Sequence, residues 1–239
     1  MKSKLAVALD FENHQLAEKL MEELKDFPVV WKVGLQLFCS AGPLWVKTRV
    51  DRGDEIFLDL KLYDIPTTVQ KAAYSILKLG VSYLTLHLSG GEKMIRSVVD
   101  LYGRERKPPK ILGVSVLTSF DQKSWDQSNL RLAGAAQKTI EDSAFAMFES
   151  GKEWGVDGIV CSAYEVKKLK EAFPGLTSVV PGIRPEGFDL GDQKRVMTPC
   201  QAQEMGADLL VIGRPITQSD QPKKVVETIF NELKINEST

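Results

Sequence analysis

Short apolar runs alternate with longer amphipathic stretches along the whole chain. Each run is rich in residues that favour strands, and the length of the stretches between them suits helices. We expect eight strands, at residues 5–9, 29–35, 55–60, 83–88, 111–117, 158–161, 178–183 and 209–213. Regular alternation of strands and helices predicts that the strands run parallel in one sheet.

The stretches between the runs repeat apolar residues at helical spacing. In the first stretch these residues are Leu16, Leu20, Met21 and Leu24. We expect further helices at 69–79, 93–101, 132–148, 164–173, 198–205 and 223–233. Eight strand–helix units predict a closed (β/α)8 TIM barrel, with an open doubly wound sheet as the alternative. No linker or change of composition divides the chain, so we expect one catalytic domain over residues 1–239.

Charge is balanced along the chain. The 31 basic and 32 acidic residues give a net charge of -1, which favours neither nucleic acid nor a membrane surface as a partner. The densest basic cluster is Arg104, Arg106, Lys107 and Lys110. Glu105 and two prolines interrupt it, which is typical of a solvated loop.

Two further features predict a cytoplasmic protein. The apolar stretch at residues 5–9 is too short for a signal peptide, and no apolar run approaches the length of a membrane span. Cys39, Cys161 and Cys200 are odd in number and lack metal-ligand spacing, which indicates a reducing compartment.

Charged residues gather where the third strand is expected to end. Asp59, Lys61 and Asp64 directly follow an apolar run. In a barrel the chemistry collects at the carboxyl ends of the strands, and Asp59 and Lys61 would share one face of this strand, ~7 Å apart. The alternative is a solvated strand end that carries an ordinary salt bridge.

Two earlier strands add one charge each. Asp10 ends the first strand, where it would serve either the site or as the N-cap of the next helix. Lys32 lies among apolar residues, so it either has a buried partner or extends its ammonium group to water. Together these residues form an alternating array of carboxylates and ammonium groups, which suits proton transfer to a carbanion.

Motifs for metals and cofactors are missing from the chain. Neither His14 nor His87 lies in a cluster with metal-ligand spacing, and His87 suits packing in the barrel better than metal binding. The residues alone therefore give no signal for a metal or a cofactor.

The last two strands predict a phosphate site. Arg184 follows Gly182, and Arg214 follows Gly213, at the ends of strands whose loops often bind phosphate in barrels. The long polar segment 185–198 would form a lid in which Gln193 reaches inward. The alternative is that both arginines make ordinary surface ion pairs.

Taken together, these segments resemble the bacterial type of the orotidine 5'-monophosphate decarboxylase family. The resemblance rests on Asp59-x-Lys61-x-x-Asp64-Ile65-Pro66, Val180-Pro181-Gly182-Ile183-Arg184-Pro185, Gly191-Asp192-Gln193 and Ile212-Gly213-Arg214-Pro215. The likeness extends from residue 7 to residue 215. The Asp-x-Lys-x-x-Asp element alone is shared with related sugar-phosphate barrels, whereas the combination is much more specific.

The resemblance implies decarboxylation of orotidine 5'-monophosphate to uridine 5'-monophosphate, the last step of de novo UMP synthesis, without a cofactor. Lys61 would protonate C6 of the pyrimidine, and Asp59 would lie near the substrate carboxylate. Lys32 would complete the array and reach the ribose, whose hydroxyls Asp10 would bind.

The resemblance also implies roles for the remaining site residues. Thr118 and Pro181 would contact the pyrimidine. The groups that hold the 5'-phosphate would be Arg184, Gln193, Gly213 and Arg214. Asp64, Ile65 and Thr68 would project into the neighbouring subunit's site, so that a homodimer completes the catalytic array.

Three residues depart from the family pattern, and none of them removes a charge from the array. They are Tyr63, where the family often has His, Thr67, where Asn is common, and Leu88, where a small residue is usual. Two other functions remain as alternatives. One is a magnesium-dependent decarboxylase or aldolase for a sugar phosphate, and the other is a non-catalytic protein that binds a phosphorylated ligand.

Overall fold

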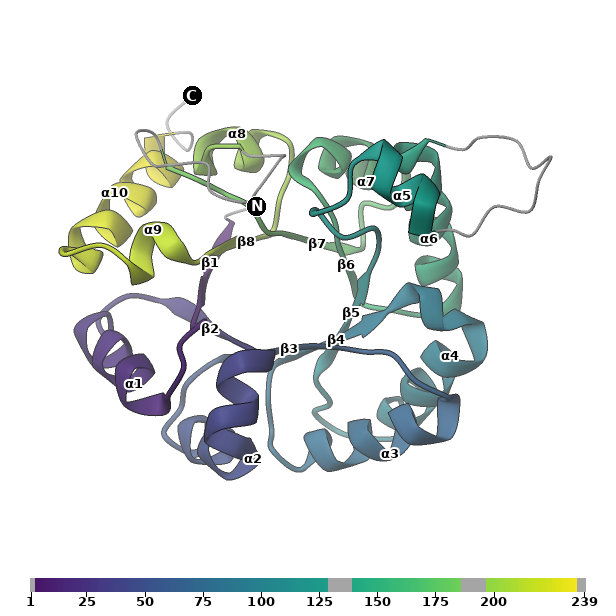
Figure 1. Cartoon of the computed structure of the whole chain (residues 1–239), viewed down its shortest axis with the longest axis horizontal. Coiled ribbons are helices and arrows are strands. Elements are labelled where there is room, and N and C mark those ends of the chain that lie inside the picture. Colours follow the sequence, from purple (N-terminus) through teal and green to yellow (C-terminus); the bar gives the residue numbers. More distant parts are fainter. Residues whose placement is uncertain (1–2, 129–138, 186–196, 236–239) are drawn as a thin grey trace.

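Eight parallel strands close into a barrel in the order of the sequence (Figure 1). The computed structural model describes residues 3–128, 139–185 and 197–235. The strands are β1 (Lys4–Ala8), β2 (Val29–Gly34), β3 (Ile56–Leu62), β4 (Tyr83–His87), β5 (Lys110–Val114), β6 (Gly158–Val160), β7 (Thr177–Val180) and β8 (Leu209–Ile212). All eight lie where the apolar runs predict them. Because β8 pairs with β1, the barrel is confirmed and the open sheet is wrong.

Helices surround the barrel between the strands (Figure 1). The α-helices are α1 (His14–Glu23), α2 (Leu35–Asp51), α3 (Pro66–Leu77), α4 (Gly91–Tyr102), α5 (Gln122–Ser128), α6 (Ile140–Trp154), α7 (Val166–Ala172), α8 (Pro199–Glu204), α9 (Arg214–Thr217) and α10 (Pro222–Ile235). Single 3-10 turns, η1 (Leu88–Gly90) and η2 (Ala163–Glu165), precede α4 and α7. The expected helices are found within three residues at each end, except that α6 continues six residues beyond the expected end at residue 148, and residues 132–138 lie outside the described part of the chain.

Three helices have no counterpart among the predicted ranges. In α2, Gly42 has a φ of 76° ahead of Pro43 and kinks the helix, so the apolar period does not run through it. The helices α5 and α9 have 7 and 4 residues, which is too short for a helical period to be visible.

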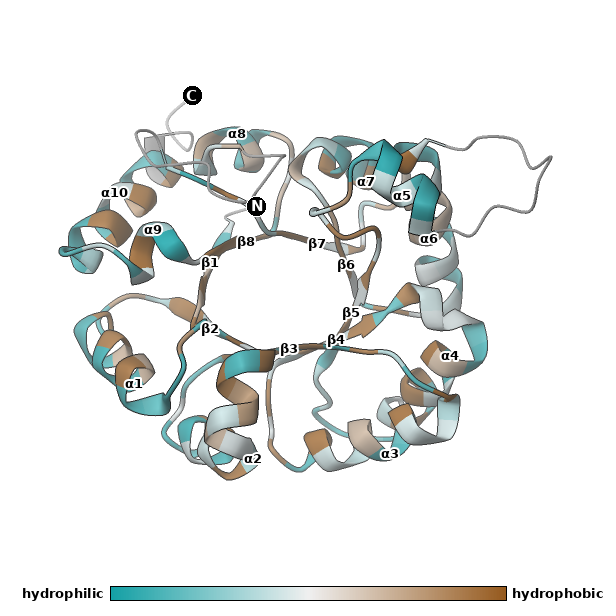
Figure 2. Cartoon of the chain, viewed as in Figure 1, coloured by the Kyte–Doolittle hydropathy of each residue, from teal (hydrophilic) through white to brown (hydrophobic). Residues whose placement is uncertain are grey.

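The barrel has two apolar layers, one inside the ring of strands and one between the strands and the helices. Figure 2 shows the strands largely in the hydrophobic colour. The inner layer consists of Ala6, Ala8, Val30, Phe57, Tyr83, Leu112, Val179, Leu209 and Val211. Side chains alternate along a strand, so the same period continued toward the carboxyl ends brings Asp10, Lys32 and Asp59 to the inside.

Two smaller observations complete the fold. None of the helices that the structure describes is both long and apolar enough to cross a membrane. Cys39, Cys161 and Cys200 are free thiols, and of these only Cys161 is buried.

Candidate active site

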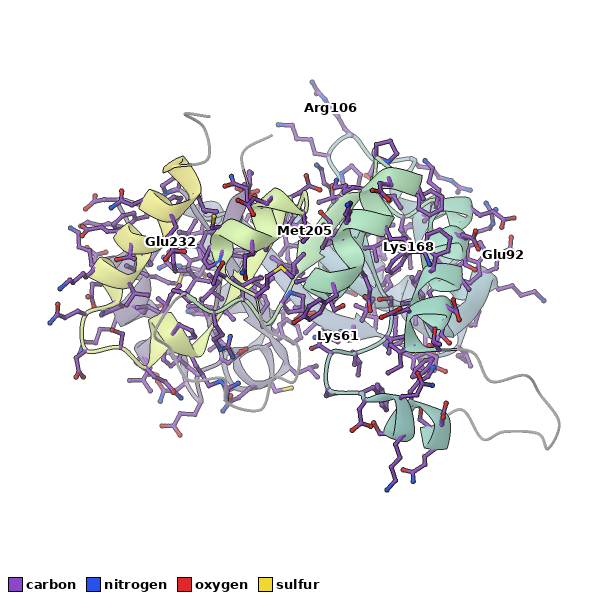
Figure 3. The ribbon with its side chains drawn as sticks, turned by 90° about the horizontal axis from the view of Figure 1, so that it is seen from above. Lys61, Glu92, Arg106, Lys168, Met205 and Glu232 are labelled. Carbon is purple, nitrogen blue, oxygen red and sulfur yellow. The ribbon has the colours of Figure 1, made fainter. Side chains whose placement is uncertain are left out.

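A cavity of about 590 Å³ opens at the carboxyl ends of the strands. Its floor is the top of the inner apolar layer, including Ala8, Phe57 and Val179. The predicted site residues that line it are Asp10, Lys32, Asp59, Lys61, Thr118, Pro181, Arg184, Gly213 and Arg214. In Figure 3, Arg106 of the basic loop projects from the top edge of the molecule, away from Lys61, which lies near the middle of the view.

Four charged side chains form a continuous array along one wall of the cavity. The Nζ atom of Lys61 lies 2.8 Å from Oδ2 of Asp59, and the Nζ atom of Lys32 lies 3.6 Å from the same oxygen. Lys32 also donates to Oδ1 of Asp10 at 3.1 Å. Lys32 is only 8% exposed and has a buried partner in Asp59, as one interpretation predicted, so the interpretation in which its ammonium group reaches water is wrong.

Asp10 belongs to this array and does not cap the helix that follows. The N-cap of α1 is Asn13, whose Oδ1 accepts a hydrogen bond from the N–H of Leu16 at 3.1 Å. Asp10 continues the inward alternation of Ala6 and Ala8, which brings its carboxylate to Lys32. The N-cap interpretation of Asp10 is therefore wrong.

The strand β3 is irregular at the two residues of the expected motif. Lys61 has a φ of 49°, and the pairing of β3 with β4 shifts between Leu58 and Leu62. The hydroxyl of Thr85, on β4, accepts the N–H of Lys61 at 2.8 Å and donates to Oδ1 of Asp59 at 3.0 Å. Sequence reasoning missed Thr85, because a single threonine within an apolar strand gives no signal.

Electrostatics favour an ionised Asp59 and a neutral His87. Burial acts to raise the pKa of Asp59, but the nearby ammonium groups of Lys32 and Lys61 and the hydrogen bonds from Lys61 and Thr85 hold it below its ordinary value. Burial, and then the charge of Lys61, lowers the pKa of His87.

His87 packs at the end of β4. Its Nδ1 accepts the N–H of Ser89 at 3.2 Å, and its ring stacks on Tyr63 at a centroid distance of 5.7 Å. Among the described residues, no group of three or more His, Cys, Asp or Glu side chains could hold a metal ion.

Two more residues shape the cavity without having been predicted. A Cβ atom on Gly34 would lie 3.0 Å from Oδ1 of Asp10 and 3.1 Å from Nζ of Lys32, so glycine leaves room for this ion pair. The sequence offered one signal for Gly34, which is its position two residues after the buried Lys32. Gln218, which follows α9, lines the cavity near Arg214, but an isolated glutamine carries no recognisable pattern.

The two predicted arginines stand on the side of the cavity formed by β7 and β8. Arg184 is 8% exposed and donates from Nη1 to the carbonyl of Ile183 at 2.9 Å, so the surface-pair interpretation is wrong for this residue. Arg214 is exposed and begins α9 directly after Gly213. Both side chains therefore line the same cavity as the lysine and aspartate array.

Three of the remaining predicted residues lie outside the cavity of their own chain. Asp64, Ile65 and Thr68 are exposed between β3 and the first turn of α3, and none lines the cavity of its own chain. The Oδ1 of Asp64 accepts the N–H of Ile65 at 2.6 Å. Gln193 and residues 186–196 of the expected lid lie outside the described residues.

Comparisons with known proteins identify relatives along nearly the whole chain. A family model described as "Orotidine 5'-phosphate decarboxylase / HUMPS family" matches residues 3–229. An orotidine 5'-phosphate decarboxylase of Pseudoalteromonas translucida is 42% identical over 232 residues, which cover 96% of this chain and 97% of the relative. One from Legionella pneumophila (strain Lens) is 42% identical over 237 residues, covering 98% of this chain and 100% of the relative.

A solved structure agrees with these relatives. The crystal structure of orotidine 5'-phosphate decarboxylase from Lactobacillus acidophilus superposes with a TM-score of 0.83 and 35% sequence identity, covering 98% of this chain and 99% of that one. The likeness therefore extends over nearly the whole length of both chains.

Proposed function

Because the chain belongs to the orotidine 5'-phosphate decarboxylase / HUMPS family, we propose that it converts orotidine 5'-monophosphate to uridine 5'-monophosphate, the last step of de novo UMP synthesis. The observation that carries the proposal is the Lys61 ammonium group at the cavity wall, 2.8 Å from Asp59. Arg184 and Arg214 border the same cavity and suit a phosphorylated ligand.

The proposed chemistry needs one carbon–carbon bond to break and one C–H bond to form. The bond from C6 to the carboxylate carbon breaks, carbon dioxide leaves, and the electron pair stays on C6. The Lys61 ammonium group stabilises this charge and donates its proton to C6, after which water returns a proton to the amine. Asp59 orients the ammonium group and disfavours the substrate carboxylate beside it.

The rest of the nucleotide would occupy the remaining cavity. We expect Asp10 and Lys32 to bind the ribose, and Thr118 and Pro181 to contact the pyrimidine. The phosphate ligands of the proposal are Arg184, Gln193, Gly213 and Arg214. Binding energy from the phosphate, remote from C6, would help to hold the reacting carbon against Lys61.

We further propose a homodimer. Tyr63 and Ile65 are each 64% exposed beside Asp64, so the β3–α3 connection presents apolar and acidic groups outside its own cavity. In the proposed dimer Asp64, Ile65 and Thr68 enter the partner's site. A cytoplasmic location remains the expectation, since a nucleotide-synthesis enzyme works where its substrates are.

The decisive experiment follows the loss of orotidine 5'-monophosphate absorbance with purified protein and a chelator. Turnover that survives the chelator supports the proposal. Turnover that disappears with the chelator and returns with magnesium would favour the metal-dependent alternative. Binding of the nucleotide without turnover would favour the non-catalytic alternative.

A further inference from the structure

The Thr85 hydroxyl touches both residues of the proposed catalytic pair, although Thr85 does not line the cavity. We propose that Thr85 is a positioning residue, whose hydroxyl fixes the Asp59 carboxylate and the Lys61 backbone in the arrangement that decarboxylation requires. This inference rests on the proposed function.

The first argument comes from the backbone of β3. Leu58 pairs with Leu84, and Leu62 pairs with Leu86, so residues 59–61 of β3 face only Thr85 of β4. Lys61 has a φ of 49°, in the left-handed region that residues other than glycine rarely adopt. Its N–H donates to the Thr85 side chain at 2.8 Å. The hydroxyl therefore satisfies a backbone donor at the irregularity that places Lys61.

The second argument comes from the direction of the two hydrogen bonds. A hydroxyl group has one proton to donate, and here its oxygen already accepts the N–H of Lys61. Its own proton is therefore available for Oδ1 of Asp59, 3.0 Å away. Thr85 is fully buried, so water does not compete for either bond.

The two carboxylate oxygens of Asp59 therefore have different partners. Oδ1 is held by Thr85, whereas Oδ2 lies 2.8 Å from Nζ of Lys61 and 3.6 Å from Nζ of Lys32. Without the hydroxyl, the carboxylate is free to rotate and the Lys61 N–H loses its acceptor. The proton donor would then be misplaced, while the surfaces that bind the nucleotide stay intact.

The test compares kcat and KM for orotidine 5'-monophosphate in three variants. Thr85→Val removes the hydroxyl at nearly constant size, and Thr85→Ser keeps it. The matched control is Ser115→Ala, which removes another fully buried hydroxyl at the end of β5, bonded to the carbonyl of Val160 at 3.0 Å. We expect Thr85→Val to lower kcat roughly 10- to 100-fold with little change in KM, as for a lost hydrogen bond to a charged group.

Three further results are expected. Thr85→Ser restores most of the turnover, and Ser115→Ala stays near wild type. The acid limb of the kcat profile moves to higher pH in Thr85→Val, because the pKa of Asp59 rises when this hydrogen bond is lost. The other charged or titratable groups around Asp59 are Lys32, Lys61, Asp10 and His87, and the substitution leaves them in place.

Specific outcomes would overturn the inference. One is a kcat of Thr85→Val within about twofold of the wild-type value. Another is a kcat of Thr85→Ser as low as that of Thr85→Val. The third is a Thr85→Val variant in which KM rises and kcat is unchanged. If Thr85→Val does not fold, Thr85→Cys replaces it, since a thiol is a weaker donor and acceptor, and wild-type turnover in that variant would equally overturn the inference. Inactive wild-type protein would instead refute the proposed function itself.

Discussion

Asp59 keeps its negative charge in a largely buried wall because two ammonium groups face one of its oxygens. Burial alone would favour the protonated carboxyl, and the pKa of Asp59 is nevertheless lowered. Lys32 is held by Asp10 on its other side at 3.1 Å. Each charge in the array therefore has an opposite charge beside it.

The first prediction at this scale concerns Lys61. Lys61→Ala removes the proposed proton donor, so we expect kcat to fall at least about 10³-fold while the protein stays folded. Steady-state kinetics and a thermal melt measure the two effects. Lys168→Ala is the control, since Lys168 lies on α7 with its ammonium group over the ring of Phe145. Near-normal turnover by Lys61→Ala would contradict the assigned role.

The second prediction concerns the titration of His87. The charge of Lys61 contributes to the lowered pKa of His87, so Lys61→Met should raise that pKa. Burial is the larger cause and persists, so the pKa should remain below its ordinary value of about 6.5. Proton NMR across the acidic range follows the change, with His14, the other of the two histidines, as internal reference. An unchanged His87 titration would place Lys61 farther away than the structure does.

At the scale of elements, the regular alternation of side chains along a strand was predictable from the sequence. Local departures from regular strand pairing and the exact start of a helix were not. Alternation of side chains placed Asp59 and Lys61 on one face of β3, and the structure confirms that they meet. The shifted pairing of β3 depends on Thr85 in another strand, which no local pattern reveals. Residue type left Asp10 open as either a site residue or the N-cap of α1, whereas the chain continues for three more residues, to Asn13, which caps the helix.

The third prediction concerns the packing of β6 between its neighbours. A Cβ atom on Gly158 would meet the carbonyl oxygen of Thr177 on β7 and approach Cδ2 of Leu112 on β5 to 2.9 Å. Gly158→Ala should therefore lower the free energy of unfolding by about 1–3 kcal/mol. Gly175→Ala is the control, because nothing lies within 4 Å of its added Cβ. Urea titration of both variants measures the difference, and equal stabilities would contradict the packing argument.

The fourth prediction belongs to the junction of β8 and α9. Arg214 begins α9 at the cavity, so Arg214→Ala should lower kcat/KM for the phosphorylated substrate by roughly 10- to 100-fold through weaker phosphate binding. Arg106→Ala changes an exposed arginine that does not line the cavity and should have no effect. Unchanged kinetics in Arg214→Ala would remove this residue from the phosphate site.

At the scale of the whole molecule, the closed barrel brings together residues from distant parts of the sequence. Asp10 and Arg214 lie at opposite ends of the chain, yet pairing of β1 with β8 makes both line one cavity. This meeting was predictable because the strand count and the barrel geometry fix it. The placement of Gln193 and the contact between subunits were not, since neither follows from the period of the strands.

The last prediction asks whether one chain contains a complete site. Asp64 is exposed outside its own cavity, so a site in the proposed dimer combines Lys61 of one chain with Asp64 of the other. Lys61→Ala and Asp64→Ala should each be nearly inactive alone. Refolded together in equal amounts, they would form mixed dimers in half of the population, each with one intact site.

The mixture should therefore regain about a quarter of wild-type activity, by the symmetry of a two-fold dimer. A chain with both substitutions, refolded with either single variant, serves as the control, because no pairing of these chains restores an intact site. Size-exclusion chromatography with light scattering checks that dimers form. If the mixture of single variants stays inactive although dimers form, Asp64 acts within its own chain, and the exposed β3–α3 connection has another role.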